Sequence, residues 1–562
     1  MHRIASAVAG LSLAFVGTSA SFAATINVPG DYALIQDAIN ASSNGDVINI
    51  AAGTYNEYNL NPGGKAITIG SASGDLDVTI DAQQGGRVFM FHSGEGEDTI
   101  LRNLALTGGS SYYGAGIYCS SSSPTISNCT ISGNTAGSSG GGMCNEYSNP
   151  TITDCTFTDC SADWQGGGMY NYVSNPTLIN CTFTGNTSVW DAGGMSNIYG
   201  SPTLYSCTFS ENIANSDGGG MANFQNSSPN LHNCTFTGNT ALIFGGGMYN
   251  ESSTPTLDGC SFVENTATSL GGGMGNDQCS PTLTGCTFTG NMTSEYGGGM
   301  ANYGMCSPIL TNCTFTGNDA VEEGGGMWNN GQAFGYGYGP CNPSLTNCTF
   351  SENTSNSGAG MCNRDDSNPS LNGCTFTSNA APARGGGMLN QSDCSPTLVG
   401  CVFTANTAQY GGGMSNYVSV DPSLDECTFT QNEAQLGGGL CNESASPTLH
   451  ACTIQENIAI WQGGGMYSSF SSAAGLSDTT VCGNTVDQIN GPWDDLDGNT
   501  VSDECAVDEN CPADIDGNGV VDVIDLLAVI DGWGTDSSDL NGDGTTDVLD
   551  LLAVIDGWGT CD

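Results

Sequence analysis

The chain has 562 residues, of which 56 are acidic and only 6 are Lys or Arg, so its formal charge is −50 at pH 7. So few bases exclude a nucleic-acid-binding surface, which needs a basic face, and they equally exclude binding to an anionic membrane surface. Glycine supplies 83 residues, about twice its usual share, while 11% of residues are charged and 38% are hydrophobic. This composition argues against charge-driven disorder and indicates internal repeats.

Residues 1–23 have the pattern of a secretory signal peptide. Arg3 supplies an early positive charge, the segment from Ile4 to Val16 is largely apolar, and Ser21 and Ala23 are small residues at the cleavage positions. The apolar segment is shorter than the roughly 20 residues that a membrane helix needs, and no later segment is apolar enough to span. We therefore expect an exported protein, secreted or held at the cell surface, that does not span a membrane and can form disulfides.

Residues 24–110 are interpreted as an N-terminal cap helix followed by the first coils of a larger unit. The segment from Tyr32 to Asn40 has apolar residues at helical spacing, and the segment from Gly45 to Tyr55 has the pattern of a turn followed by a strand. These two segments are similar to the start of pectin-lyase-like chains, in which a short helix covers the open end of the first coil. Such a cap keeps the exposed strand edges from pairing with another molecule.

Residues 111–490 repeat one phrase about every 26 residues. A clear copy runs from Gly297 to Asn318 and reads GGGMANYGMCSPILTNCTFTGN. Its last cysteine recurs at intervals of 25 to 27 residues, with one interval of 35, at Cys129, Cys155, Cys181, Cys207, Cys234, Cys260, Cys286, Cys313, Cys348, Cys374, Cys401, Cys427 and Cys452. A unit this short cannot hold its own core, so neighbouring units must stack.

The pattern within the unit predicts short β-strands. Cys313 and Phe315 are two residues apart and are flanked by threonines, which is the alternation of a strand with Cys and Phe pointing inward. Glycine and proline divide the unit into short segments, and no window has a helical period. The sequence therefore predicts an all-β fold, a parallel β-helix of about 16 coils with three short strands in each. We expect the recurring Asn318 to stand in a left-handed turn and to hydrogen-bond to its counterpart in the next coil.

The repeat resembles a known group of proteins. The element from Phe183 to Asn186 (Phe-x-x-Asn) and the Gly-Gly-Met element look like the repeats of chlamydial polymorphic outer-membrane proteins and of bacterial right-handed β-helix repeat proteins. The resemblance covers most of residues 111–490. It implies a right-handed, pectin-lyase-like β-helix and, by analogy, a role in adhesion.

Two features of the coils are candidate ligand sites. Trp164 and Trp190 stand just before the glycines in consecutive coils, where a row of aromatic rings can lie along a sugar chain. Tyr336 and Tyr338 belong to the extra loop of the one 35-residue unit, and a single insertion in a regular rod is a place where function is often found. The alternatives are that the tryptophans only cover the coil edges and that the loop is a disordered protrusion.

Enzymatic activity is left open by the sequence, which favours a non-catalytic role. A lyase acting on uronates needs basic residues, and the few that remain are not clustered. A glycoside hydrolase needs two nearby carboxylates, which adjacent coils can supply. The candidates are Glu322 and Glu323 with Glu295, and Asp365 and Asp366 with Asp393, although the favoured interpretation of each is a solvated loop charge. Because His232 and His450 occupy one outward repeat position, they do not indicate a Ser-His-Asp site.

The cysteines outside the main column suggest disulfides. Cys119 and Cys144 follow the glycine-rich element in adjacent coils, and Cys279 and Cys306 precede the Ser-Pro element in adjacent coils. The distance between coils is within the range that a disulfide spans, so we predict the pairs Cys119–Cys144 and Cys279–Cys306. The main-column cysteines are interpreted as small buried apolar residues, with metal binding or disulfides as the alternative.

The C-terminal part carries two copies of a calcium-loop pattern. Residues 491–562 contain 19 acids and no base, and we divide them into a Cys-containing acidic linker, 491–510, and a module, 511–562. In each copy oxygen-bearing residues stand at loop positions 1, 3, 5, 9 and 12 with glycine at position 6, which predicts two calcium ions. The expected ligands are Asp514, Asp516, Asn518, Asp522 and Asp525 in the first loop, and Asp539, Asn541, Asp543, Asp547 and Asp550 in the second.

The tandem loops, each followed by one short helix, resemble a type I dockerin-like module of the kind found at the ends of exported planctomycete-type bacterial proteins. Dockerins bind cohesin modules, so the resemblance implies a cohesin-like or other surface-anchoring partner. Loop positions 10 and 11 are apolar here, Val523-Ile524 and Val548-Leu549, which implies an apolar partner surface. Two further cysteine pairs flank these parts, Cys482 with Cys505 at the linker and Cys511 with Cys561 at the module.

Together these features predict a secreted β-helix that binds carbohydrate or another surface, or displays itself on one. A calcium-dependent, dockerin-like module would anchor it to a partner. The alternative is an extracellular polysaccharide-degrading enzyme, a glycoside hydrolase or lyase of pectin-lyase-like fold.

Overall fold

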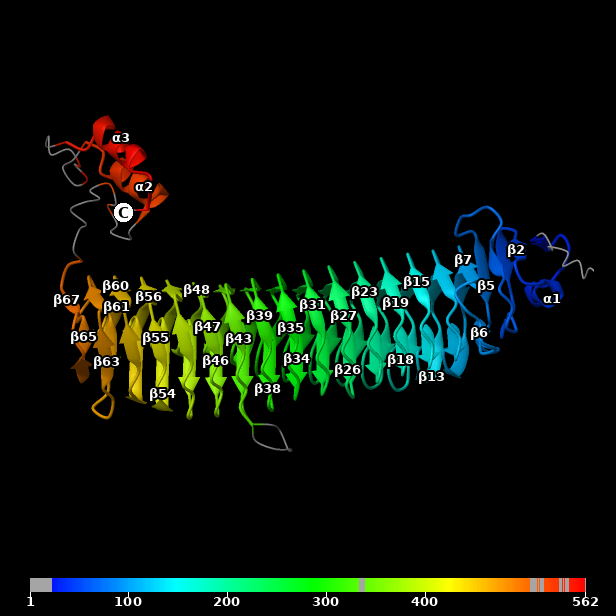
Figure 1. Ribbon diagram of the computed structural model, residues 1–562, viewed down its shortest axis with the longest axis horizontal. Helices are drawn as coiled ribbons and strands as arrows, with labels where there is room; N and C mark the ends of the chain where they lie inside the picture. Colours follow the sequence, from blue (N-terminus) through cyan, green and yellow to red (C-terminus); the bar gives the residue numbers. More distant parts are fainter. Residues whose placement is uncertain are drawn as a thin grey trace, which may run out of the picture.

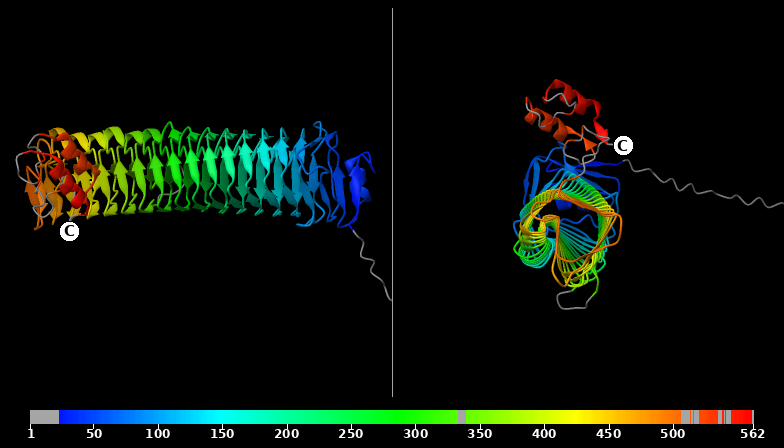
Figure 2. Two further views of the ribbon diagram at one scale, coloured as in Figure 1. Left: turned by 90° about the horizontal axis from the view of Figure 1, so that it is seen from above. Right: turned by 90° about the vertical axis from the view of Figure 1, so that its left-hand side faces the viewer.

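The computed structural model describes residues 23–332, 339–505, 513, 515, 520–534, 538, 540 and 545–560. Most of them form a long rod of stacked coils, which is seen from the side in Figure 1 and along its axis in Figure 2. The predicted signal peptide lies outside the described residues except for Ala23. Among the described residues, no helix is long and apolar enough to cross a membrane.

Each regular coil contains four short strands. A typical coil has β35 (Thr282–Thr284), β36 (Thr287–Thr289), β37 (Met292–Thr293) and β38 (Met300–Tyr303). Each strand pairs in parallel with the equivalent strand of the next coil, as β36 does with β40 (Thr314–Thr316). The expectation of three strands per coil is wrong because the fourth, at β37, often has only two residues and carries no apolar alternation.

The equivalent strands form four long parallel sheets. Counted over the described residues, sheet A has 19 strands from β1 (Thr25–Val28) to β66 (Trp493–Asp495), and sheet B has 18 from β3 (Gly53–Tyr55) to β67 (Thr500–Ser502). Sheet C has 16 strands from β6 (Phe89–Phe91) to β65 (Ile489–Asn490), and sheet D has 14 from β9 (Ser110–Tyr113) to β61 (Ile458–Gln462). Sheet B thus indicates about 18 turns rather than the expected 16. The difference arises because the first and last turns lack the cysteine and glycine pattern on which the expected number depends.

Columns of identical side chains fill the interior. The repeat cysteines and phenylalanines are fully buried, as predicted, and the flanking threonines face outward. Successive phenylalanine rings stack face to face, for example Phe236 on Phe262 with centroids 4.8 Å apart and planes within 4°. This spacing equals the distance between hydrogen-bonded strands, so one coil is stacked on the next at this interval.

Two ladders of buried asparagine run beside the apolar columns. In the first, Asn265 Nδ2 donates to Asn291 Oδ1 at 3.0 Å and to the backbone oxygen of Phe236 at 2.9 Å. In the second, which the sequence did not suggest, Asn276 Nδ2 in sheet C donates to Asn302 Oδ1 at 2.8 Å. The expected left-handed turn belongs instead to the residue before the ladder asparagine, such as Glu264 with φ of 52°.

The three consecutive glycines allow the turn into sheet C to stack tightly. At Gly298 a Cβ atom would lie 2.5 Å from the backbone oxygen of Asp319 and 2.6 Å from that of Gly325 in the next coil. Such distances are well inside van der Waals contact, so backbone must pack directly on backbone here. Two other coils have alanine at the equivalent position, Ala115 and Ala359, so the turn accepts only glycine or the smallest side chain here.

The two ends of the rod are closed differently. At the N-terminal end the helix α1 (Ile35–Ala41) buries Ile35, Ala38 and Ile39 against the first coil, which agrees with the predicted cap. At the other end a disulfide joins Cys482 to Cys505, and the last strands carry acids such as Asp494 and Asp495. Charges on an edge strand oppose pairing with another molecule.

The C-terminal part contains two helices with nearly identical sequences. These are α2 (Val523–Asp531) and α3 (Val548–Asp556), and the short strands β68 (Val520–Val521) and β69 (Gly559–Thr560) pair antiparallel. Its small core is built on Val521, Val529 and Val554.

Candidate functional site

The candidate functional site is a line of side chains that lie outside the main core, many of them buried, which we call the C–D seam. It lies where each coil passes from sheet D, through three small residues that are mostly glycine, into sheet C. The seam consists of the residue before these three and the second and fourth residues of each sheet C strand from β18 (Met169–Tyr172) to β58 (Leu440–Ala445). The residues before the glycines are Gln165, Asp191, Asp217, Phe244, Leu270, Tyr296, Glu323, Ser357, Arg384, Tyr410 and Leu436.

Contacts within single coils show that the two sides of the seam face each other. In one coil Trp328 Nε1 donates to Glu323 Oε2 at 3.2 Å, and in another the ring centroids of Phe244 and Tyr249 are 5.7 Å apart. Both pairs are five residues apart in sequence and lie on either side of the glycines. The glycine turn therefore folds the outer face of sheet C against the end of sheet D.

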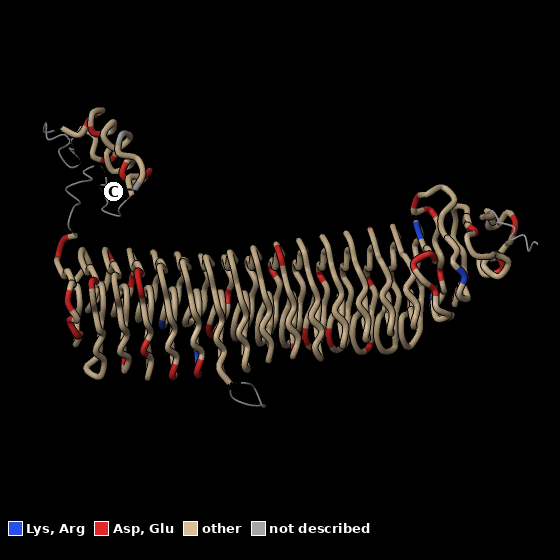
Figure 3. The backbone as a smooth tube through the Cα atoms, in the orientation of Figure 1, with Lys and Arg blue, Asp and Glu red and all other residues tan. Residues whose placement is uncertain are grey.

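Four carboxylates, one in each of four consecutive coils, make up the acidic segment of the seam: Asp191, Asp217, Glu251 and Asp277. Gln165 Nε2 donates to Asp191 Oδ2 at 2.9 Å, and the backbone N–H of Phe244 donates to Asp217 Oδ1 at 3.1 Å. The chain has no Lys or Arg between residues 103 and 363, so these coils contain no base that could neutralise the segment. Figure 3 shows how few basic residues the rod carries.

Burial raises the pKa of every carboxylate in the acidic segment. For Asp217, removal from water is the largest cause, the negative charge of Asp191 adds to it, and the pKa is raised to about 7. For Asp277, burial and then the charge of Glu251 raise the pKa to about 6. The pKa values of Asp191 and Glu251 are also raised, chiefly by burial. Asp217 and Asp277 therefore exchange protons near neutral pH.

Aromatic side chains stand within the acidic segment of the seam and continue beyond it. The hydroxyl oxygens of Tyr249 and Tyr303 are 3.1 Å apart, and both side chains are almost fully buried. Further along, the Tyr296 ring stacks on Trp328 with centroids 4.8 Å apart. Tyr303, Tyr296 and Trp328 belong to an apolar cluster outside the main core.

The next coils hold the arginine segment of the seam. Arg364 Nη1 lies 3.1 Å from both carboxylate oxygens of Glu323, and Arg384 forms an ion pair with Glu443. The Arg384 guanidinium also lies over the Tyr410 ring, 4.5 Å from its centroid, in a cation–π contact. Both arginines are therefore already balanced by acids in the seam.

The seam concentrates buried polar atoms that have no hydrogen-bond partner. Within the described residues there are seven such side-chain atoms, and six belong to the seam. They are Ser196 Oγ, Asp277 Oδ1, Arg364 Nε, Arg384 Nη1, Ser415 Oγ and Glu443 Oε2. Arg384 Nη1 and Glu443 Oε2 form an ion pair with each other. The other four seam atoms have no partner among the described residues, which is costly unless a ligand or water supplies one.

The structure places Trp164 and Trp190 side by side at the surface, next to the start of the seam. Their ring centroids are 5.0 Å apart, and they are 48% and 50% exposed. Trp164 also lines a surface hollow of about 380 Å³ with Tyr112 and Tyr170. Tyr336 and Tyr338 lie outside the described residues.

The acids proposed from the sequence fall in two places. Glu295 and Glu322 are exposed on the outer side of sheet D, while Glu323 turns into the seam. Asp365, Asp366 and Asp393 line a shared hollow of about 140 Å³ at the far end of the sheet C strands.

Sequence reasoning missed Asp191 and Asp217, because they stand in the column where other coils have an aromatic residue. Comparing the column directly before the glycines across all coils would have found them.

The cysteine predictions need correction at two pairs. Cys119 pairs in register with Asn145 and Cys144 with Tyr118, so the two thiols lie on opposite faces of sheet C and are free. Cys279 and Cys306 do lie together, but both are free thiols, and Cys306 Sγ instead accepts a hydrogen bond from the Cys279 backbone N–H at 3.1 Å. Cys511 and Cys561 lie outside the described residues.

Six predicted calcium ligands lie outside the described residues: Asp514, Asp516, Asn518, Asp539, Asn541 and Asp543. The other four have matching geometry in both copies. Asp525, at loop position 12, is fully buried, and its two carboxylate oxygens accept from the backbone N–H groups of Ile515 at 2.6 Å and Asp522 at 2.8 Å. Asp550 makes the same pair of bonds to Leu540 and Asp547, both at 2.8 Å.

This geometry fits a calcium loop, because the position-12 carboxylate ties the start of the loop to the start of the helix. Asp522 and Asp547 also cap the N-termini of α2 and α3. All of these groups offer the hard oxygen atoms that calcium prefers.

One face of each C-terminal helix is apolar and exposed. The large apolar side chains on α2, α3 and the residues just after them are each 50–56% exposed: Val523, Ile524, Leu527, Ile530, Trp533, Val548, Leu549, Leu552, Ile555 and Trp558. Clustered exposure of this kind marks an interaction surface.

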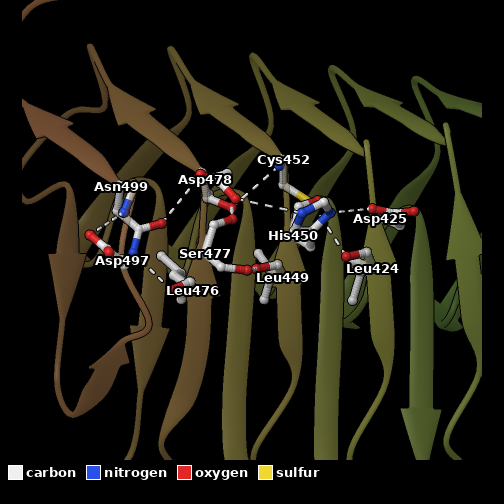
Figure 4. A network of polar contacts seen from close by, with 12 residues as sticks. Leu424, Asp425, Leu449, His450, Cys452, Leu476, Ser477, Asp478, Asp497 and Asn499 are labelled. Carbon is white, nitrogen blue, oxygen red and sulfur yellow. Dashed lines mark hydrogen bonds and ion pairs between the residues drawn. The ribbon is translucent and has the colours of Figure 1, made fainter.

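A row of polar residues on sheet A has the residue types of a hydrolase triad without its geometry. Figure 4 shows Asp425, His450 and Ser477, which are paired in register across three coils. His450 Nδ1 is 2.6 Å from Asp425 Oδ1, but Nε2 faces Asp478 at 3.6 Å, and the Ser477 hydroxyl donates to the backbone oxygen of Leu449. Since His450 does not hydrogen-bond to Ser477, nothing activates the serine as a nucleophile.

Comparison with known proteins gives a family and distant structural likenesses. The protein-family model described as "Right handed beta helix region" matches residues 93–267, 197–337 and 274–454, which together span more than half of the chain. No curated protein matches the sequence.

Three solved structures illustrate the structural likenesses. A mannuronic acid specific polysaccharide family 6 lyase from human gut microbiota is 12% identical, with 71% of this chain and 86% of that chain covered and a TM-score of 0.33. An alginate lyase mutant is 11% identical, with 85% and 100% covered and a TM-score of 0.25. The catalytic domain of an α-1,3-glucanase in complex with tetrasaccharides is 12% identical, with 85% and 69% covered and a TM-score of 0.22.

These values are too low to carry an inference about activity. The repeated coils and the family match agree, and the chain belongs to the right-handed β-helix family.

Proposed function

We propose that this chain is an exported β-helix protein that binds a polysaccharide along the C–D seam. The observation that carries the proposal is a set of buried polar atoms with neither a hydrogen-bond nor an ion-pair partner among the described residues. Four of the five such atoms lie in the seam: Ser196 Oγ, Asp277 Oδ1, Arg364 Nε and Ser415 Oγ. A polysaccharide offers many hydroxyl groups that both donate and accept hydrogen bonds, so it can satisfy serine, carboxylate and guanidinium atoms alike. The aromatic rings beside these atoms supply apolar faces for sugar rings.

Export and anchoring complete the proposal. The segment 1–23 is proposed to be a signal peptide, and the Cys482–Cys505 disulfide is consistent with an oxidising compartment. The C-terminal part is proposed to be a calcium-dependent, dockerin-like module with two bound calcium ions. The exposed apolar faces of α2 and α3 support an anchoring partner with a complementary apolar surface, cohesin-like or otherwise.

A glycan array probed with the labelled full-length protein tests binding. We expect binding to a limited set of extended polysaccharides and reduced binding by the variant Ser196→Val/Ser415→Val, which removes two of the partnerless seam hydroxyls. Thr237→Val/Thr289→Val, made on the outer face of sheet B, is the matched control and should bind as the native chain does. Absence of binding to every glycan would overturn the proposal.

A second candidate function is hydrolysis of a glycosidic bond. The observation that favours it is that Asp217, with its pKa raised to about 7, stands one coil from Asp191. A protonated acid beside a carboxylate is the pair that glycoside hydrolysis needs. Release of reducing ends from a bound polysaccharide, lost in Asp217→Asn, is the expected result. A lyase acting on uronates is not favoured, because no base lies in the acidic segment.

A further inference from the structure

The surface hollow of about 380 Å³ next to the start of the C–D seam has aromatic side chains on two sides, and we call it the aromatic hollow. Tyr112 lines one side, and Trp164 and Tyr170, which stand two coils further along, line the other. The coil between them contributes only residues 137–139, Gly-Ser-Ser. Because Tyr112 and Trp164 are 64% and 48% exposed, their rings are within reach of a ligand in solution.

The hollow exists because residues 137–139 have almost no side-chain bulk. In the coil of residues 242–244 the same three positions hold Leu, Ile and Phe. A second comparison comes from the phrase Trp-Gln-Gly-Gly-Gly-Met-Tyr, which occurs at residues 164–170 and again at 461–467. The coil before the second copy has Gln435 and Leu436 where the coil before the first has two serines. The aromatic hollow therefore depends on one coil of small residues, and not on the phrase that follows it.

Trp164 presents a free aromatic face to the hollow. Trp190, in the following coil, stacks on Trp164 with ring centroids 5.0 Å apart. Since residues 137–139 belong to the preceding coil, Trp190 covers the face of the Trp164 indole that points away from the hollow. The other face offers the flat apolar contact that the C–H face of a pyranose ring can cover.

Two polar groups also line the hollow, the carboxylate of Asp163 and the hydroxyl of Tyr170. Among the described residues, neither group has a hydrogen-bond partner. Burial raises the pKa of Tyr170, so its hydroxyl stays protonated and can donate a hydrogen bond. A sugar hydroxyl both donates and accepts, so it can bond to either group. Aromatic walls with a few polar groups are the usual composition of a small-ligand site.

We propose that the aromatic hollow is a binding site for one neutral pyranose ring of a polysaccharide, stacked on Trp164 and hydrogen-bonded to Asp163 and Tyr170. This assignment rests on the proposed polysaccharide binding, and it names a subsite and the class of sugar that the subsite takes. The volume of the hollow is near the lower limit for small-ligand sites, which suits a single ring. Its lining includes a carboxylate and no base, so it repels a uronic acid and favours a neutral sugar.

An apolar side chain of a protein partner fits the hollow less well. A bound proline or aromatic side chain would cover the Tyr170 hydroxyl and the Asp163 carboxylate without offering them hydrogen bonds, which is unfavourable. Indole is therefore the probe that represents this occupant.

Titration of the full-length protein, followed by saturation-transfer NMR, tests the site. The probes are the methyl glycosides of glucose, galactose, mannose and glucuronic acid, together with indole. We expect a neutral glycoside to bind about fivefold or more tightly than the glucuronide, because the glucuronide is repelled by Asp163. Trp164→Ala should weaken the binding of the neutral glycoside about two- to tenfold, which is the effect of losing one aromatic contact.

Gly137→Leu is the decisive variant, because it places a side chain in the hollow itself. A Cβ atom at Gly137 would meet no heavy atom closer than 3.9 Å, and Leu242 already occupies the same position in another coil, so the fold accepts the change. Binding of the neutral glycoside should weaken by about tenfold or more, because the sugar ring is excluded. Ser294→Leu, at the same position in a distant coil, and Trp461→Ala, in the second copy of the phrase, are the matched controls and should bind as the native chain does.

Unchanged binding by Gly137→Leu, equal affinities of Trp164→Ala and Trp461→Ala, tighter binding of the glucuronide, or binding of indole alone would overturn the site. Cellohexaose and mannohexaose separate this failure from that of the proposed function. Hexasaccharides that bind equally to the native chain and to Gly137→Leu would overturn the aromatic hollow and leave polysaccharide binding along the seam standing. Binding of no sugar of any length would overturn both.

Discussion

Asp217 links the charge of the seam to the stability of the coils. Its pKa is raised in the folded chain, first by burial and then by Asp191, so the folded state binds this proton more strongly than the unfolded state. The resulting contribution to stability is fully present below the ordinary carboxyl pKa of about 4 and is lost as the pH rises through about 7. At alkaline pH the ionised Asp217 opposes folding.

We therefore predict that Asp217→Asn unfolds at a higher temperature than the native chain at pH 8, by on the order of a degree or two. The difference should shrink at pH 5, where the native carboxyl is largely protonated. Scanning calorimetry at both pH values measures it, with the exposed Asp154→Asn as the control. A gain that is the same at both pH values would contradict the electrostatic explanation.

His450 provides a second titration at the residue scale. The hydrogen bond to Asp425 raises the pKa of its imidazole, since the bond favours the charged ring. We expect an NMR titration to place the pKa above 6.5 in the native chain and lower in Asp425→Asn. Asp258→Asn, which removes an exposed carboxylate elsewhere on sheet A, is the control and should leave the His450 titration unchanged. An unchanged His450 titration would exclude the Asp425 contact.

At the scale of the element, each strand is stabilised by the side chains of the neighbouring coils that stack on its own. Phe262 in β32 (Ser261–Val263) packs between Phe236 and Phe288, with centroids 4.8 and 4.7 Å away. Because each coil touches only its neighbours, a defect in one strand weakens the coils on both sides and leaves distant coils intact.

Truncation of one ring in this column tests that view. Phe262→Ala should lower the free energy of unfolding by about 3–5 kcal/mol, because it leaves a cavity in a closely packed column. Ser261→Ala, on the outer face of the same strand, should change it by less than about 0.5 kcal/mol. Denaturant unfolding measures both variants, and hydrogen exchange should show the loss of protection confined to the neighbouring coils. A uniform loss along the rod would contradict nearest-neighbour stabilisation.

The helices α2 and α3 depend on the loops that precede them. Asp525 and Asp550 each bring two backbone N–H groups together, but they are fully buried acids in a segment without a base. Calcium bound by the loops would offset that charge and hold the helices in place.

We therefore predict that chelation of calcium lowers the helical circular dichroism signal and abolishes one calorimetric transition, and that added calcium restores both. Asp525→Ala/Asp550→Ala should show no such response, while the β-sheet signal of the coils stays constant in all samples. Helices that persist unchanged in chelator would rule out a calcium-dependent module.

At the scale of the whole molecule, sequence alone predicts most of the rod. The columns of Cys313, Phe315 and Asn318 could be foreseen because a stacked repeat must place equal positions on equal sites. The seam could not, since it depends on how sharply the chain reverses at the glycines and on side chains that differ from coil to coil. An alignment of the coils places Asp191 and Asp217 in one column with Phe244 and Tyr296, but only the folded structure shows that this column packs against the outer face of sheet C.

Because the coils stack at a constant interval, the length of the rod is proportional to the number of coils. A duplication or loss of one coil adds or removes one step of its length and leaves the backbone pairing of the remaining coils in register. The distance from the capped N-terminal end to the proposed anchor can thus change in fixed increments. The number of subsites along the seam changes by the same steps. The number of repeats would therefore set both the length of the rod and the length of polymer that it binds.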